Sequence, residues 1–289
     1  MISLLASVRD LAEAQAAAAA GADLIDLKEP SAGALGGLPI AQIDSIVAAL
    51  RERWPKRPVS ATIGDFRADD HAGRGAQAAA VARCGVDYVK AGIEPGAHAL
   101  AALQALAALQ LPAPGSRPSG SRPPGSRPPG SRPPGSIVIV FLADRGVDLA
   151  LAERAAAMGF AGLMLDTADK STGSLLRHAD RAALAGLLAL ARRHGCLSGL
   201  AGSLTRDDVA VLRQLAPDFA GFRGAVCDGD RRGRFNPGKL RTLRAALRGE
   251  KPQREFPGKS LGQTLGSPSD SDSSARSRAG SDLPRSSIG

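Results

Sequence analysis

Cysteines, aromatic residues and long apolar runs are all scarce in this sequence of 289 residues. The three cysteines, Cys84, Cys196 and Cys227, form no CxxC pair, which excludes a disulfide framework and a cysteine-based zinc site. No uncharged apolar run approaches the roughly 18 residues that a membrane span needs. Charged residues near the N-terminus interrupt the apolar segment that a signal peptide requires. We therefore expect a cytoplasmic protein.

Positive charge is in excess, but it is unevenly distributed along the chain. Of the net charge of +9, residues 112–136 contribute +4 and residues 251–289 contribute +2, which leaves +3 for the remainder. Residues 112–136 repeat GSRPP and cannot form a helix or a sheet ladder. We interpret them as a solvated low-complexity insert, with an SH3-type ligand as the alternative. Residues 249–289 are rich in Ser, Gly and Arg and are expected to form a disordered tail.

Short apolar runs alternate with Ala/Leu-rich segments of helical spacing over residues 1–248. We predict strands near 3–7, 24–28, 59–63, 88–92, 137–142, 162–166, 197–201 and 219–223. We predict helices over 9–20, 40–53, 71–84, 97–110, 147–158, 179–194, 205–215 and 237–248. This alternation is typical of a (β/α)8 TIM barrel. A doubly wound sheet is the alternative, but no GxGxxG motif follows the first strand. We predict one catalytic barrel domain over 1–248.

The stretch DLIDLKEP, residues 23–30, carries charge at the end of a predicted strand. Side chains alternate along a strand, so Asp26 and Lys28 share one face with Leu24. A lysine among apolar residues loses solvation of its charged form, which lowers its pKa toward that of an amine nucleophile. Asp26 would hold and orient Lys28. An ordinary salt bridge is the alternative for this pair taken alone.

Three further charged residues lie at or just beyond the ends of other predicted strands. Lys90 lies at the end of the fourth strand, Asp166 ends the sixth, and Lys170 follows four residues later. The carboxyl ends of barrel strands meet at one rim, where the active sites of such barrels lie. Converging lysines and aspartates in a nearly dry site have little value for stability alone. We therefore predict a catalytic cluster of Lys28, Lys90, Asp26, Asp166 and Lys170.

Turns containing glycine follow the last two predicted strands, AGS at 201–203 and RGA at 223–225. Small residues where a helix opens let backbone N–H groups reach a ligand, and phosphate sites in barrels commonly lie after strands seven and eight. As isolated tripeptides, both could be ordinary turns. At these two positions we predict that a substrate phosphate binds to Gly202, Ser203, Arg223 and Gly224.

The sequence contains no recognisable metal motif. The four histidines, His71, His98, His178 and His194, are dispersed, and there is no HExxH motif or His/Cys cluster. Only His178 follows a predicted site residue closely enough to be considered at the rim. We expect no metal and no cofactor.

Several segments in a fixed order carry a family resemblance. They are LLASVRDLAEAQAAAAAGADLIDLKEPSAGALGGLP, VSATIGD, GVDYVKAGI, LMLDTADK, LAGSL and GFRGAVC. Together they resemble the (5-formylfuran-3-yl)methyl phosphate synthases, also called 4-(hydroxymethyl)-2-furancarboxaldehyde-phosphate synthases. The resemblance covers about residues 1–248 apart from 112–136. It implies a carbon–oxygen lyase acting on phosphates, which joins two glyceraldehyde 3-phosphate molecules into a furan on the way to methanofuran.

The resemblance also implies residue roles. Lys28 resembles the lysine that forms a Schiff base, and Lys90 the acid/base lysine. Asp26, Asp166 and Lys170 match the supporting charged residues. The expected partner is a phosphorylated triose, without nucleic acid or membrane, and a homo-oligomer is left open. Two alternatives remain, another barrel enzyme acting on a sugar phosphate (an aldolase, decarboxylase or epimerase) and a non-enzymatic basic protein that binds through its arginine repeat.

Overall fold

Eight parallel strands close into a barrel in the computed structural model, which describes residues 1–33, 35–66, 71–109, 111 and 136–250. Each strand pairs with the next along the chain, and β8 pairs with β1 to complete the cylinder. The strands are β1 Ser3–Val8, β2 Leu24–Leu27, β3 Val59–Phe66, β4 Tyr88–Ile93, β5 Ser136–Leu142, β6 Gly162–Asp166, β7 Leu197–Leu200 and β8 Phe219–Phe222.

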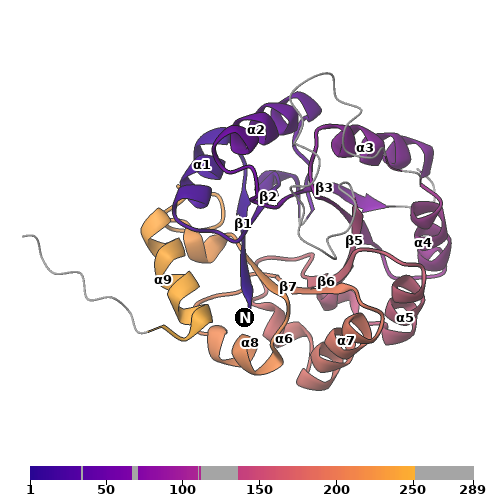
Figure 1. Ribbon diagram of the computed structural model, residues 1–289. Coiled ribbons are helices and arrows are strands. Elements are labelled where there is room, and N and C mark those ends of the chain that lie inside the picture. The colour runs from indigo at the N-terminus through magenta and orange to yellow at the C-terminus, as the bar shows by residue number, and fades with distance from the viewer. Residues whose placement is uncertain (34, 67–70, 110, 112–135, 251–289) are drawn as a thin grey trace, which may run out of the picture. The chain divides into compact units, whose positions relative to one another are not determined.

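Helices surround this barrel, as the view along its axis in Figure 1 shows. They are α1 Leu11–Ala19, α2 Ile40–Arg53, α3 His71–Arg83, α4 Ala99–Ala107, α5 Leu149–Ala157, α6 Leu175–His178, α7 Arg181–Arg193, α8 Val209–Leu215 and α9 Pro237–Arg248. Three short 3-10 turns, η1 Pro30–Ala32, η2 Ala143–Arg145 and η3 Gly224–Val226, follow β2, β5 and β8. The predicted (β/α)8 TIM barrel is therefore confirmed.

Two elements differ from the sequence-based prediction. Strand β3 continues to Phe66, past the predicted end at residue 63, with a register shift against β4 between Thr62 and Asp65. The short helix α6 was not predicted, because its four residues are too few to show a helical period. Both differences lie at the carboxyl end of the barrel, where loops vary most.

Polar caps explain where several helices begin. The carboxylates of Asp10, Asp148 and Asp180 accept the N–H groups of residues three positions later, at the starts of α1, α5 and α7. Asn236 does the same for α9, which has Pro237 in its first turn. Such caps satisfy N–H groups that the helix itself leaves without a partner.

The apolar residues form two layers separated by the sheet. The larger layer lies between strands and helices and includes Ile25 and Leu27 of β2. The smaller layer fills the barrel interior and includes Leu24 of the same strand, with Leu5 and Met164. The alternation predicted for β2 is thus confirmed, since Asp26 and Lys28 follow Leu24 on the inner face.

The predicted insert and tail fall almost entirely outside the described residues, which omit 112–135 and 251–289. The domain boundaries therefore stay predictions. None of the helices in the described part of the chain has the length and apolarity that a bilayer span requires.

Candidate active site

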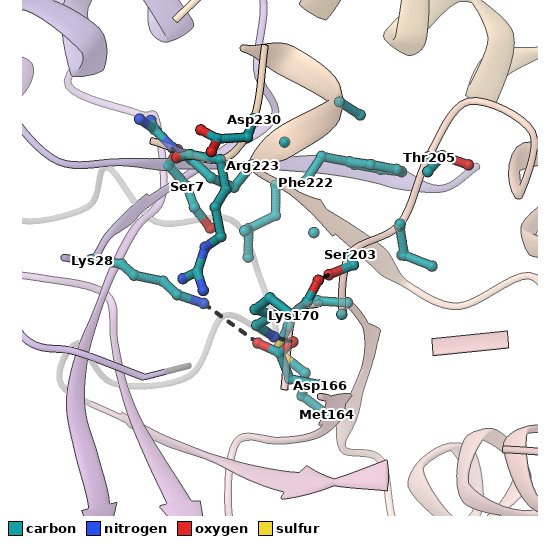
Figure 2. A pocket seen from close by; sticks show the side chains of 18 of the residues that line it. Ser7, Lys28, Met164, Asp166, Lys170, Ser203, Thr205, Phe222, Arg223 and Asp230 are labelled. Carbon is teal, nitrogen blue, oxygen red and sulfur yellow. Dashed lines mark hydrogen bonds and ion pairs between the residues drawn. The ribbon is translucent and has the colours of Figure 1, made fainter. Parts of the chain in front are cut away.

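A pocket of about 240 Å³ opens at the carboxyl end of the barrel. Figure 2 shows it from close by. Residues of β1, β4, β6 and β8 line it together with Lys28, which directly follows β2, and the loops after β6, β7 and β8 form its walls. The predicted site residues that line it are Lys28, Lys90, Asp166, Lys170, Gly202, Ser203, Arg223 and Gly224. The structure therefore brings together residues that the sequence analysis selected from five separate segments.

Lys90 and Asp26 form the deepest ion pair, with 2.8 Å between Lys90 Nζ and Asp26 Oδ1. Asp26 is fully buried and also accepts hydrogen bonds from the hydroxyls of Ser7 (3.1 Å) and Ser60 (2.6 Å). Burial lowers the pKa of the Lys90 amine, and the charge of Asp26 offsets part of this effect. Lys90 is thus an amine that loses its proton more easily than a solvated lysine.

Asp166 joins the other two lysines. Its Oδ2 lies 3.4 Å from Lys28 Nζ, and its Oδ1 accepts a hydrogen bond from Lys170 Nζ. Figure 2 shows Lys28 and Asp166 facing one another across the pocket. Although burial opposes ionisation, the two ammonium groups hold the pKa of Asp166 well below its usual range. Burial also lowers the pKa of Lys170 to about 8 despite the nearby charge of Asp166.

The expected pairing of Asp26 with Lys28 is wrong. Asp26 pairs with Lys90 from β4, whereas Lys28 pairs with Asp166 from the opposite side of the barrel. Asp26 and Lys28 share a face but lie about 6–7 Å apart along the strand direction, and each contacts a charged side chain that reaches it from another strand. Such contacts depend on barrel closure, which local spacing does not reveal.

Arg223 lies at the predicted phosphate site, but its guanidinium donates all its hydrogen bonds to other groups of the protein. Both terminal nitrogens donate to the carboxylate of Glu13 on α1, with 3.1 Å between Nη2 and Oε1. The remaining N–H groups donate to the carbonyls of Ser7, Arg231 and Gly233. All five donors of the side chain are therefore used within the protein. In this conformation the side chain has no donor left for a phosphate. If this turn binds a phosphate, its backbone N–H groups are the available donors.

Backbone N–H groups at these two turns remain available. Within the described residues, the structure records no acceptor for the amides of Gly202, Ser203, Leu204, Gly224 or Ala225, all of which line the pocket. Free amides of this kind bind anions well. The expectation that AGS opens a helix is wrong, since α8 begins only at Val209. Ser203 has φ +46°, and its hydroxyl donates to the carbonyl of Lys170 at 3.1 Å.

One charged residue of the pocket was not predicted from the sequence. Arg231 lies on the loop after β8 and lines the pocket together with Asp166 and Lys170. Nothing in the local sequence DGDRRGR distinguishes Arg231 from its two arginine neighbours. His178, which was considered for the rim, instead contacts Thr172 at 3.0 Å and does not line the pocket. No group of three His, Cys, Asp or Glu side chains in the described ranges could hold a metal ion.

Comparison with known proteins assigns the family. The family model for 4-HFC-P synthase matches residues 4–244, which is most of the chain. The chain belongs to the 4-HFC-P synthase family. The resemblance inferred from its motifs is therefore confirmed.

Relatives of this synthase family match over most of their lengths. The (5-formylfuran-3-yl)methyl phosphate synthase of Methanosarcina acetivorans is 34% identical over 237 residues, 80% of this chain and 93% of that protein. A protein of Methylorubrum extorquens is 38% identical over 224 residues, 78% of this chain and 82% of its own. The synthases of this family are enzymes, so the pocket described above is the place to look for their chemistry.

Solved structures agree with the barrel fold. Phosphoribosyl anthranilate isomerase from Thermus thermophilus has a TM-score of 0.55 at 16% identity, covering 86% of this chain and 99% of its own. A 3-hexulose-6-phosphate synthase has a TM-score of 0.51, also at 16% identity, covering 85% of this chain and 100% of its own. At this level of identity the likeness concerns the fold alone.

Proposed function

We propose that this protein condenses two molecules of glyceraldehyde 3-phosphate into (5-formylfuran-3-yl)methyl phosphate, in the biosynthesis of a methanofuran-type cofactor. The observation that carries the proposal is the pairing of three lysines with two buried aspartates in one pocket, within a chain of the synthase family. The atoms balance when the two trioses release one phosphate and two water molecules. No oxidant or reductant is needed.

In the proposed first step, Lys28 Nζ attacks the carbonyl carbon of one triose phosphate and water leaves, so that an imine forms. Lys28 supports this role because it lines the pocket while remaining 6% exposed, so a small substrate reaches it but bulk water largely does not. The imine makes the adjacent C–H acidic. Removal of that proton gives an enamine, which forms the carbon–carbon bond to the carbonyl of the second triose.

Lys90 is proposed as the group that removes this proton. Its pKa is lowered mainly by burial and further by the positive charge of Lys28, so the neutral amine is accessible. Asp26 then stabilises the ammonium that results, at 2.8 Å. After phosphate loss, ring closure and dehydration, water hydrolyses the imine and restores Lys28.

Lys170 is proposed to protonate the departing phosphate. With a pKa of about 8 it is mostly protonated at neutral pH, yet it gives up its proton more readily than an exposed lysine. Asp166 holds it in place through a hydrogen bond. The free amides at Gly202–Leu204 and Gly224–Ala225 are proposed to bind a substrate phosphate.

Incubation with glyceraldehyde 3-phosphate and mass analysis of the products tests the reaction. The expected result is the furan aldehyde monophosphate together with inorganic phosphate. Borohydride added during turnover should reduce the imine and attach a stable adduct to the peptide that contains Lys28. Lys28→Arg should form neither product nor adduct, because a guanidinium stays protonated and is not nucleophilic.

Lys170→Arg is the matched control for the adduct. It makes the same Lys-to-Arg substitution at the other lysine that pairs with Asp166. It should still trap the imine on Lys28. An adduct on Lys170 in the wild type would contradict the assignment of Lys28. A triose-phosphate aldol product without a furan would instead favour the alternative of another sugar-phosphate aldolase.

A further inference from the structure

The loop after β8 is a tight and well-supported hairpin. Cys227 and Phe235 form an antiparallel bridge at its base, and Asp228 N donates to the carbonyl of Arg234 at 2.8 Å. Gly233 lies so close to Asp228 that a Cβ added there would come within 1.8 Å of the Asp228 carbonyl. The loop therefore has little freedom to rearrange its backbone.

Arg9, directly after β1, and Arg223, directly after β8, hold the backbone of this loop. Arg223 donates to the carbonyls of Arg231 at 2.8 Å and Gly233 at 3.4 Å, and Arg9 donates to the carbonyl of Arg232 at 3.1 Å. Three consecutive carbonyls are thus held by buried or half-buried guanidinium groups. The arginine predicted from the sequence as a phosphate ligand acts here as a support for the segment that carries another arginine.

The side chain of Arg231 makes few contacts of its own. It donates one hydrogen bond, from Nη2 to the carbonyl of Gly33 at 3.2 Å. Among the described residues, no carboxylate oxygen lies within 4.0 Å of its guanidinium, and four of its five N–H donors have no recorded acceptor. It nevertheless lines the pocket. Burial lowers the pKa of its guanidinium there, and the negative charge of Asp166 offsets part of this effect.

The pocket carries an excess of positive charge. Lys90 is neutralised by Asp26 and Arg223 by Glu13. Lys28, Lys170 and Arg231 remain, against the buried Asp166 and the exposed Asp230, whose Oδ1 accepts the backbone N–H of Arg232. Cations that lack counterions in a half-buried site are costly unless an anion joins them. The excess of positive charge therefore favours binding of an anionic ligand next to Arg231.

We propose that Arg231 forms a second phosphate subsite, separate from the backbone amides at Gly202–Leu204 and Gly224–Ala225, which binds the phosphate of the second triose. This inference rests on the proposed condensation of two phosphorylated substrates. The planar guanidinium offers paired donors that match two phosphate oxygens, as a lysine does not. Each substrate phosphate then has its own anchor.

Binding of glycerol 3-phosphate, an unreactive triose phosphate analogue, tests the subsite by titration calorimetry. The wild type should bind two molecules per chain. Arg231→Gln should bind one, or bind the second about ten- to a hundredfold more weakly, as expected from loss of a charge-assisted hydrogen bond. Arg231→Lys, which keeps the charge without the paired donors, should fall between the two. Arg232→Gln is the matched control, because Arg232 is exposed, belongs to the same loop and does not line the pocket.

In turnover, Arg231→Gln should raise the KM for glyceraldehyde 3-phosphate about tenfold or more, while borohydride still traps the first triose on Lys28. A wild type that binds a single molecule per chain overturns the second subsite, as does an Arg231→Gln variant that matches Arg232→Gln in stoichiometry and affinity. If the wild type makes no furan but binds two molecules, one of them through Arg231, the proposed reaction fails and the subsite stands.

Discussion

Arg223 and Glu13 form a buried pair in which both terminal nitrogens of the guanidinium contact both oxygens of the carboxylate. Each side chain is only 8% exposed. The pair joins β8 to α1 next to the seam where β8 meets β1, and the same guanidinium supports the hairpin that carries Arg231. A residue that lines the pocket is thus also a structural link between two parts of the barrel.

Arg223→Ala should therefore destabilise the fold. It removes the paired hydrogen bonds to Glu13, whose remaining ion pair is with Arg9 at 3.3 Å, and the loss of hydrogen bonds to a charged group costs about 1.5–3 kcal/mol. Chemical denaturation should show this as a lower midpoint. The double variant Glu13→Leu with Arg223→Met should recover much of the stability, yet its KM should stay raised because the hairpin has lost its support. A single Arg223→Ala variant as stable as the wild type would contradict a structural role for the pair.

The pH dependence of kcat/KM should show a falling limb near pH 8. Lys170 has a pKa of about 8 and is proposed to donate a proton, so activity is lost as rising pH removes that proton. The charge of Asp166 raises this pKa. Asp166→Asn should consequently move the limb to lower pH, by about one to three units.

Lys170→Arg serves as the control for this profile. The guanidinium stays protonated over the whole range, so the limb near pH 8 should disappear even if the remaining activity is low. An unchanged limb in Lys170→Arg, measured by steady-state kinetics between pH 6 and pH 10 at steps of about half a unit, would assign it to another group.

Substitution of Gly202 should destabilise the protein more than substitution of Gly159, because only Gly202 is crowded by a neighbouring residue. Both have positive φ, +107° and +82°. An added Cβ at Gly202 would lie 2.9 Å from Thr167 Cγ2 and 3.0 Å from Thr167 N, whereas Gly159 has nothing within 4 Å. Gly159→Ala should cost about 1–2 kcal/mol of unfolding free energy from backbone strain alone.

Gly202→Ala adds a steric clash of about 1–3 kcal/mol to the same strain. It should also raise the KM, because the neighbouring free amides are displaced from the phosphate. Thermal unfolding and substrate titration of the two variants provide the comparison. Equal stability and equal KM would show that this turn neither packs tightly nor binds substrate.

The Pro/Arg repeat should be dispensable for catalysis. Replacing residues 115–135 with a short Gly/Ser loop, while keeping Ser136 at the start of β5, should leave kcat within a factor of about three. The described chain resumes at Ser136, the amino end of β5, whereas the pocket lies at the carboxyl end of the barrel. A large loss of activity in this variant would give the repeat a role in organising the enzyme.

Local sequence was enough to predict the barrel and most of the charged side chains in its pocket. The period of two along β2 places Asp26 and Lys28 inside with Leu24, and strand ends supply Lys90 and Asp166 by the same rule. These inferences succeed because side-chain direction in a strand depends only on neighbouring residues. The family motifs span the same strand ends, so the resemblance and the physical pattern point to one pocket.

Pairing within that pocket was decided by the tertiary structure. Lys28 contacts Asp166, 138 positions along the chain, and not Asp26 two residues away. Arg223 contacts Glu13, 210 positions away, which removes its side chain from the predicted phosphate site. Arg231 gains its place in the pocket because other arginines hold the backbone of its loop. Each choice depends on the closure of β8 against β1 and on the charges that this closure brings together, and no local pattern in the sequence records either.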